Sequence, residues 1–543
     1  MSASPRALAH EVEAAPALDT RTKRNILIAM CTALMAVIAS VSGLNVAQQE
    51  LASAFNASQS EILWIINAYT VTLAALLMPI GAIGDRWGRK PVLMSGLGLF
   101  VASSLLGAFA GSVEVMIAAR VLAGVGAAMI MPVTLSVITS SFPPEERSRA
   151  IGIWAGVAGA GGTIGMFVSA FMVDIVNWRW LYALPVVLVS MSALMAQKSV
   201  PNSREHSGHR FDVGGSILSL FAIGGLVLGI HEGPEQGWTH PLSLGGLIVG
   251  VVALVGFIVW ENRQIDPLLD ISVFRDRSLA AGSMTLVLLF GVMFGIFLVL
   301  FPFFQAVVGW SALRSAVALL PMSFVMMPAS TFAPKVSARL GSRKTMLLGL
   351  AIAGTGLATI ALRASVEGGY MSVLPGLLII GLGMGITMTP ATESITATLP
   401  TEKQGVASAL NDTSREVGGA LGIALFGSIV SAGYGSAIEP ALAGFPTELA
   451  EQASEGIGSA YVVAGQAGDQ APALIDAAKH AFVDGWVQSM WVGVAMIGVA
   501  FLFVALRGPK RIVTTAETTD VDATDVDATD ESVVAAGELI TVS

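Results

Sequence analysis

The chain has 543 residues, of which 54% are hydrophobic and only 12% are charged. Typical soluble domains carry about 25% charged residues, so this composition excludes an ordinary soluble protein. The net charge of −9 comes in large part from the C-terminal tail, and no basic patch with interleaved aromatic residues indicates nucleic-acid binding.

The chain begins with a polar segment, residues 1–25, that has neither the apolar core nor the small-residue cleavage site of a signal peptide. We expect this segment to be a cytoplasmic tail. Apolar runs of about 20 residues then recur along nearly the whole chain, which is the pattern of transmembrane helices. The sequence therefore predicts an all-α polytopic membrane protein. Its single cysteine, Cys31, excludes an internal disulfide and is interpreted as a small packing residue.

Fourteen apolar segments are long enough to span a membrane. They cover roughly residues 26–45, 61–83, 92–110, 115–137, 150–172, 179–197, 213–231, 242–261, 279–303, 314–333, 345–362, 371–394, 405–430 and 486–506. Their order indicates an N-terminal lobe of six spans (26–197), two extra spans with their loops (198–278), and a C-terminal lobe of six spans (279–506). The remaining tail, 507–543, contains a short acidic repeat and is predicted to be disordered.

The distribution of basic residues predicts the orientation of these spans. Placing both termini in the cytoplasm puts roughly 23 of the 29 Lys and Arg residues on the inner side, as the positive-inside rule requires. We therefore expect a multi-pass protein with both termini cytoplasmic and the lipid bilayer as its main surroundings.

The loop between the second and third predicted spans gathers charges and glycines in one short turn. Glycines allow a tight turn and a close approach of two helix ends, and an acid here has a neighbouring helix end and nearby bases as partners. The residues in question are Gly81, Gly84, Asp85, Arg86, Gly88, Arg89 and Lys90. On physical grounds alone, this is a charged hinge on the cytoplasmic side.

The same loop resembles the signature loop of the major facilitator superfamily, Gly-x-x-x-Asp-Arg-x-Gly-Arg-Lys. The resemblance implies a two-lobed transporter fold with fourteen transmembrane helices, and it implies that the loop acts as a cytoplasmic gate. A weaker copy follows the second span of the second lobe and contains Arg339, Gly341, Arg343 and Lys344, but it has Ala338 where Asp85 stands. Internal repetition of this kind is expected of a two-lobed transporter.

Arg120 lies in the outer half of the fourth span. A charged side chain in hydrocarbon costs at least ~2.5–3.5 kcal/mol, so we expect it to face a cavity or an acid. The alternative is an arginine that extends outward to the membrane interface. The resemblance implies a role in proton coupling for this arginine.

The fifth span is rich in small residues, among them Gly161, Gly165 and Ser169, which allow close helix contacts. In the fourteen-span drug:proton antiporters that the chain resembles, this span carries Gly-Pro-x-x-Gly-Gly. Here Met166 replaces the proline. The first span of these exporters also carries an acid, for which this chain has Ser40, although Asn45 of the same motif is present. Both departures weaken the expectation of proton antiport.

Few acids remain that could carry a proton. Glu393 ends the twelfth span, and Asp412, Arg415 and Glu416 lie in the inner half of the thirteenth. Asp412 and Arg415 are spaced i,i+3 and can pair on one helix face, with Glu416 one turn from Asp412. Two acids that share one base can hold one proton between them. A purely structural ion pair is the alternative interpretation.

Two aromatic residues, Trp64 and Tyr69, open the second span and could form an aromatic wall for flat cationic substrates. An interfacial aromatic belt would produce the same pattern. His206 and His209 supply only two ligands, so no metal site is predicted. The segment 431–484 is interpreted as a connector outside the membrane, with a cap over the outer mouth as the alternative.

From residue 25 to about residue 506, the chain resembles actinobacterial-type exporters that confer resistance to quaternary ammonium compounds and methyl viologen. The resemblance implies secondary efflux of amphipathic, cationic compounds in exchange for protons, by a functional monomer in the bacterial cytoplasmic membrane. The alternative is a facilitator, or a lipid or metabolite exporter, with altered coupling. No catalytic set and no ATP-binding loop stand out, so we expect no enzyme and no cofactor, with the proton gradient as energy source.

Overall fold

The computed structural model describes residues 18–203, 211–443 and 445–508. The predicted acidic tail, most of the N-terminal tail and the histidines at positions 206 and 209 lie outside these residues. Within them, fourteen helices are long and apolar enough to cross a membrane, which confirms the predicted all-α polytopic fold.

The helices are numbered in chain order. Their bounds are α1 Thr20–Val46, α2 Gln48–Phe55, α3 Gln59–Trp87, α4 Arg89–Ala108, α5 Val113–Ser141, α6 Pro144–Ile175, α7 Ala183–Ser199, α8 Val213–Gln236, α9 Pro241–Glu261, α10 Arg277–Pro302, α11 Ala312–Leu340, α12 Ser342–Arg363, α13 Gly369–Thr396, α14 Gln404–Ile438, α15 Thr447–Ser454, α16 Ile457–Ala464 and α17 Ala471–Arg507.

Polar caps explain where several of these helices begin. Asp19 accepts a hydrogen bond from the Thr22 backbone N–H, so α1 starts six residues before the predicted first span. Ser58 and Glu61 form a complete capping box at the start of α3. The apolar runs therefore mark the membrane-buried part of each helix, while the caps set its full length.

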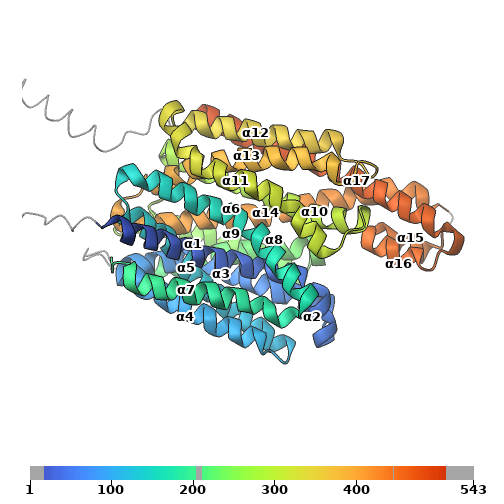
Figure 1. Cartoon of the computed structure of the whole chain (residues 1–543), viewed down its shortest axis with the longest axis horizontal. Helices are drawn as coiled ribbons and strands as arrows, with labels where there is room; N and C mark the ends of the chain where they lie inside the picture. Colours follow the sequence, from blue (N-terminus) through green and yellow to red (C-terminus); the bar gives the residue numbers. More distant parts are fainter. Residues whose placement is uncertain (1–17, 204–210, 444, 509–543) are drawn as a thin grey trace, which may run out of the picture.

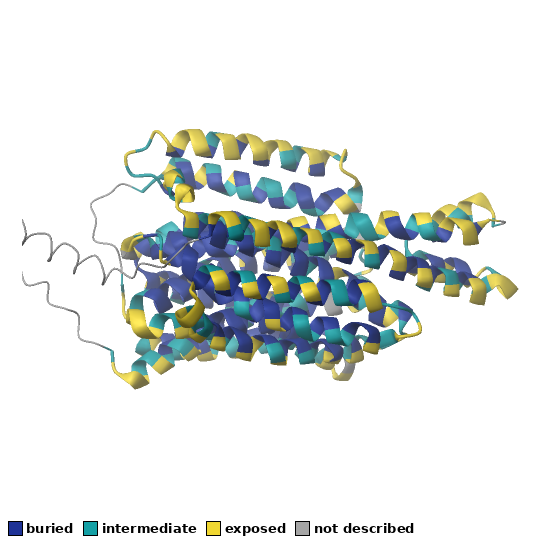
Figure 2. Cartoon of the chain, turned by 90° about the horizontal axis from the view of Figure 1, so that it is seen from above, coloured by how far each residue is buried: buried dark blue, intermediate teal, exposed yellow. Residues whose placement is uncertain are grey.

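The long helices form two bundles. One contains α1 and α3–α7, and the other contains α10–α14 and α17; they meet where α6 packs on α11 and where α14 packs on α3 and α5 (Figure 1). Buried residues are concentrated in the middle of the assembly and exposed ones around its outside, as Figure 2 shows. We call the end that holds Gly88, Gly341 and Arg507 the motif end, and the other end the opposite end.

The two extra helices, α8 and α9, form a hairpin against the seam between the bundles. α8 contacts both α3 and α14, whereas α9 packs chiefly on α8. The two helices approach closely at glycines: a Cβ on Gly225 would lie only 2.9 Å from the Gly246 carbonyl oxygen.

The segment 431–484, which was predicted as a connector, is largely helical in its described residues. α14 continues to Ile438, two short helices (α15 and α16) follow, and α17 already begins at Ala471. Leu474 therefore lies in the first part of α17, and Trp486, where the fourteenth span was predicted to begin, is fully buried. α15, α16 and the first part of α17 form an extension that projects from the opposite end (Figure 1).

Candidate functional site

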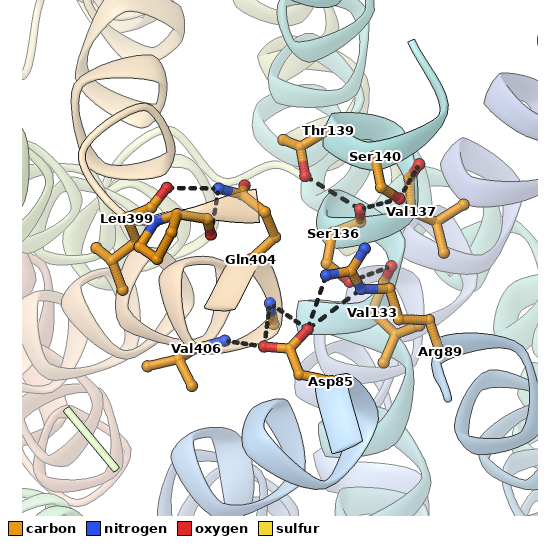
Figure 3. Close-up of polar contacts among 12 residues, drawn as sticks. Asp85, Arg89, Val133, Ser136, Val137, Thr139, Ser140, Leu399, Gln404 and Val406 are labelled. Carbon is orange, nitrogen blue, oxygen red and sulfur yellow. Dashed lines mark hydrogen bonds and ion pairs between the residues drawn. The ribbon is translucent and has the colours of Figure 1, made fainter. Parts of the chain in front are cut away.

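Asp85, at the end of α3, is bound to the first residues of α14. Its carboxylate accepts hydrogen bonds from the Gly405 N–H at 2.9 and 2.8 Å and from the Val406 N–H at 3.2 Å (Figure 3). The first N–H groups of a helix have no partner within the helix, and α14 has no side-chain cap of its own. An acid of one bundle thus caps a helix of the other and meets the positive end of its dipole.

Arg89 balances the charge of this acid. Its Nη2 and Nε lie 2.9 and 3.2 Å from the same Asp85 oxygen, and both side chains are buried. The turn between them depends on Gly88, whose φ of +110° favours glycine. Close contact between the helices depends on Gly81, where a Cβ would lie 2.6 Å from the Gly405 carbonyl oxygen.

The other residues of the signature loop contact α5 and α7 or face a hollow at the motif end. Lys90 donates a hydrogen bond to the Gln197 carbonyl at the end of α7, 2.8 Å away, and Gly84 packs near Val133 of α5. Arg86 is exposed and lines a hollow at the motif end together with Asp266.

Gln404 stabilises the turn before α14, and this turn positions the first N–H groups of α14 next to Asp85. The Gln404 side-chain amide donates to the Leu399 carbonyl at 3.0 Å (Figure 3). It also donates to the Thr396 carbonyl at 2.8 Å and so ties the end of α13 to the start of α14. In the second bundle, Gly341 has a similar positive φ of +81°, but Arg343 there donates to the Ala505 carbonyl at the end of α17. The two turns therefore have different partners.

Arg120 points into the first bundle, not outward. It is 1% exposed, its Nη1 lies 3.2 Å from the Ser40 hydroxyl, and its Nε lies 3.3 Å from the Ile65 carbonyl oxygen. Its guanidinium also sits 4.3 Å from the centre of the Tyr69 ring. This arginine is therefore in direct contact with Ser40, the position at which the sequence resemblance implied an acid, and Ser40 offers only a hydroxyl.

A cavity of about 160 Å³ lies between the bundles, with walls from α1, α3, α5, α6, α10 and α14. Its lining is mainly apolar and includes Tyr69, Met166, Phe290, Phe294, Arg415 and Glu416. Cavities that combine apolar walls with a few polar groups are typical of small-molecule sites.

The charged wall of this cavity comes from α14. Arg415 donates to Asp412 at 3.2 Å and lies 4.5 Å from the centre of the Phe290 ring. Asp412 is fully buried and also accepts from the Asn411 amide at 3.1 Å. Arg415 is thus engaged by Asp412, whereas Glu416 makes no hydrogen bond among the described residues and faces the cavity.

The remaining predicted residues lie in different places. Glu393 is buried beside Ser148 of α6 and does not line the cavity; one of its carboxyl oxygens has no hydrogen-bond partner among the residues that the structure describes. Trp64 is half-buried near the start of α3, also away from the cavity wall. Asn45 belongs to α1, but its side chain is not among those described.

The small residues of the fifth span pack within the first bundle. A Cβ on Gly165 would lie 2.5 Å from Ala39, Gly161 lies near Met35, and Ser169 contacts Gly43, all on α1. Contact with the other bundle comes instead from the preceding turns of α6, where the Gly152 carbonyl accepts from the Ser330 hydroxyl at 3.0 Å.

Sequence reasoning missed the aromatic side of the cavity. Phe290, Phe294 and Phe297 recur at helical spacing along α10, which could have indicated one apolar face, but not which neighbour it meets. Among the residues that the structure describes, no group of three or more His, Cys, Asp or Glu side chains is placed to hold a metal ion.

Comparisons of the sequence with known proteins identify relatives of this chain. The profile of the Major Facilitator Superfamily matches residues 28–423. The chain is 31% identical over 465 residues to the multidrug efflux pump LfrA of Mycolicibacterium smegmatis, covering 83% of this chain and 91% of that protein. It is 30% identical over 477 residues to the methyl viologen resistance protein SmvA of Salmonella typhimurium, covering 85% and 93%.

Solved structures show the same fold at low sequence identity. The proton:xylose symporter XylE matches with a TM-score of 0.57 and 13% identity, over 91% of this chain and 97% of that one. A bacterial homologue of the lysosomal transporter Spinster, in an inward-facing conformation, matches with a TM-score of 0.56 and 17% identity, over 90% and 98%.

Proposed function

Because this chain belongs to the major facilitator superfamily, whose members are membrane transporters, we propose that it is a secondary multidrug exporter of the bacterial cytoplasmic membrane. It exports amphipathic cations by alternating access, in exchange for protons. The motif end faces the cytoplasm.

One observation carries this proposal: a cavity between the two bundles lies beyond a closed contact at the motif end. Alternating access requires a central site that opens to one side at a time. The bonds between Asp85 and α14 join the bundles on one side of the cavity, so they must break before the cavity can open there.

The cavity wall supports the choice of substrate. Phe290, Phe294 and Tyr69 offer aromatic faces, and Glu416 offers a carboxylate that makes no hydrogen bond of its own among the described residues. Aromatic faces and a carboxylate attract organic cations. The names of the relatives, a multidrug efflux pump and a methyl viologen resistance protein, support the same class.

The same carboxylate supports exchange with protons. A cation and a proton cannot both neutralise Glu416 at once, so binding of one favours release of the other. Arg415 leaves this acid available because Asp412 already pairs with it.

A second candidate is a facilitator, or a lipid or metabolite exporter, with altered or absent proton coupling. The contact between Arg120 and Ser40 favours this second candidate, because the sequence resemblance implied an acid at position 40 and this chain has only a hydroxyl there. Met166 in the cavity wall, where related exporters carry proline, points the same way.

A bacterial host that lacks its other exporters tests the proposed function. Cells that express the chain should accumulate less ethidium and resist higher concentrations of it than cells with an empty vector. Glu145→Gln, an exposed acid at the motif end, serves as the control and should behave like the wild type. Equal ethidium accumulation with and without the chain, at verified membrane expression, would refute export of organic cations.

A further inference from the structure

Two acids that the central cavity does not use meet at the motif end of the α8–α9 hairpin. Asp212 precedes α8, and its Oδ1 accepts hydrogen bonds from the Gly215 N–H at 2.8 Å and from the Trp260 indole N–H at 2.9 Å. The acid thus caps α8 and ties it to α9. Its other oxygen, Oδ2, is buried and has no hydrogen-bond partner among the described residues.

Glu261 is the last residue of α9 and is only 3% exposed. Its Oε2 accepts a hydrogen bond from the Leu269 N–H at 3.3 Å, so it holds the linker that leads from the hairpin to α10. Its other oxygen, Oε1, is buried and has no hydrogen-bond partner in the described part of the chain. The hairpin and the linker are therefore joined through one carboxyl group.

The two unpartnered oxygens converge on the same point. A Cβ built on Gly215 would collide with Glu261 Oε1 and would lie 2.5 Å from Asp212 Oδ2, so both oxygens face the space that this glycine leaves open. Two carboxylates whose buried oxygens face each other, and which form no ion pair with a base among the described residues, repel each other strongly.

The charged groups nearby have other partners or contacts. The hollow beside Asp212 is also lined by Asp85 and Arg86 from α3, Asp266 from the linker, and Glu402 and Lys403 before α14. Asp85 is bound to Arg89, and Lys403 donates to the Pro267 carbonyl at 3.1 Å. Arg86 and Asp266 each make further contacts of their own.

We propose that Asp212 and Glu261 bind one proton between them, so that one carboxyl donates a hydrogen bond to the other. The shared proton removes the repulsion between the two carboxylates. It also gives Asp212 Oδ2 and Glu261 Oε1, the two oxygens without a partner, one hydrogen bond that they share. This proton site is separate from the central cavity and does not depend on which substrate the chain carries.

Loss of this proton would affect the contacts at the motif end, because the site lies next to them. The linker that Glu261 holds forms one wall of the hollow that Asp85 and Val406 also line. With the proton bound, the linker stays docked on the hairpin beside the start of α14. Without it, two like charges face each other and the linker is released.

Thermal unfolding of the full chain in lipid nanodiscs, followed across a range of pH, tests the site. The protonated pair stabilises the fold at low pH, and this stabilisation is lost as the pH rises and the shared proton dissociates. The midpoint temperature of unfolding of the wild type should therefore fall by about 2–4 °C from low to high pH. In Glu261→Gln, the amide donates to Asp212 Oδ2 without a titrating proton, so this fall should disappear. Glu145→Gln, the exposed control, should keep it.

Hydrogen exchange at Leu268 and Leu269 locates the effect. At the higher pH, these amides should exchange faster in the wild type than in Glu261→Gln measured at the same pH. Asp212→Asn retains a capping oxygen and provides the second variant if Glu261→Gln does not fold.

Two results would overturn the shared proton. An unchanged pH dependence in a folded Glu261→Gln or Asp212→Asn variant would mean that the pair does not titrate. A midpoint that is restored at high pH by added sodium, potassium or calcium ions would mean that the oxygens hold a metal cation instead.

Discussion

Asp85 is the residue on which closure at the motif end depends most. It accepts hydrogen bonds from two backbone N–H groups of α14, those of Gly405 and Val406, and forms an ion pair with Arg89, although it is almost completely buried. Hydrogen bonds to charged groups contribute about 1.5–3 kcal/mol each. Opening of this end must exchange these bonds for water, so the balance between closed and open states is sensitive to the charge of this one side chain.

Asp85→Asn should therefore impair transport without removing the protein from the membrane. The amide keeps one oxygen acceptor but loses the charge that meets the α14 dipole and Arg89. We expect the rate of ethidium efflux to fall at least about tenfold, which corresponds to about 1.4 kcal/mol. Wild-type efflux by this variant, at equal membrane content, would refute the gating role.

Glu416 is the residue on which exchange with protons depends in this account. Glu416→Gln should leave the Asp412–Arg415 pair intact and flatten the pH dependence of efflux, because the competing proton site is gone. Asp412→Asn should also change the pH profile, because it frees Arg415 to pair with Glu416. Unchanged profiles in both variants would favour a structural role for the three residues.

Ser40 allows the missing acid to be restored. Its hydroxyl lies 3.2 Å from Arg120, so Ser40→Asp places a carboxylate against an existing buried guanidinium. We expect this variant to fold and to exchange more protons per substrate than the wild type, as measured in vesicles with a pH-sensitive dye. Ser40→Asn is the control of matched shape; equal proton exchange in both variants would contradict this prediction.

At the scale of elements, the contact of α3 with α14 depends on two facing glycines. A Cβ on Gly405 would collide with the Gly81 carbonyl and lie 2.7 Å from the Asp85 carboxyl carbon. Overpacking of this kind typically costs about 1–3 kcal/mol, and here it acts on the closed state of the motif end.

Gly405→Ala should thus shift the protein toward states that are open at the motif end. Spin labels at Arg149→Cys on α6 and Arg339→Cys on α11, in a Cys31→Ser background, report the separation of the bundles there. We expect a larger population at long distance in Gly405→Ala than in Gly98→Ala, whose added methyl group meets nothing within 4 Å. Identical distance distributions would show that the glycine pair does not control closure.

The elements also show how far sequence reasoning extends. Fourteen spans could be predicted because apolar runs of sufficient length form helices in lipid. The extension formed by α15, α16 and the start of α17 could not. Its short helices are stabilised by tertiary contacts, such as the bond from the Tyr434 hydroxyl to the Ala453 carbonyl, which no local pattern reveals.

The same limit applies to the site. The acid and bases of the signature loop stand out in the sequence, but their partner, the Gly405 N–H, is 320 residues away in the chain. The pairing of Asp412 with Arg415 is local and could be anticipated from helical spacing. The contact of Arg120 with Ser40 required the packing of α5 on α1.

At the scale of the whole molecule, two bundles enclose a cavity, and contacts at the motif end hold it closed on one side. The α8–α9 hairpin spans the seam between α3 and α14, so it contacts both parts that must move. Glu416 lines this cavity, and in the proposed exchange it is the carboxylate that substrate and proton neutralise in turn.

Everted membrane vesicles with an acidified interior and a pH-sensitive dye test this central claim most directly. Addition of ethidium or another organic cation should collapse the preformed proton gradient in vesicles that contain the wild-type chain. Vesicles with Glu416→Gln should keep their gradient. Movement of the cation in wild-type vesicles without any movement of protons would contradict the exchange and leave facilitated or otherwise driven export as the function.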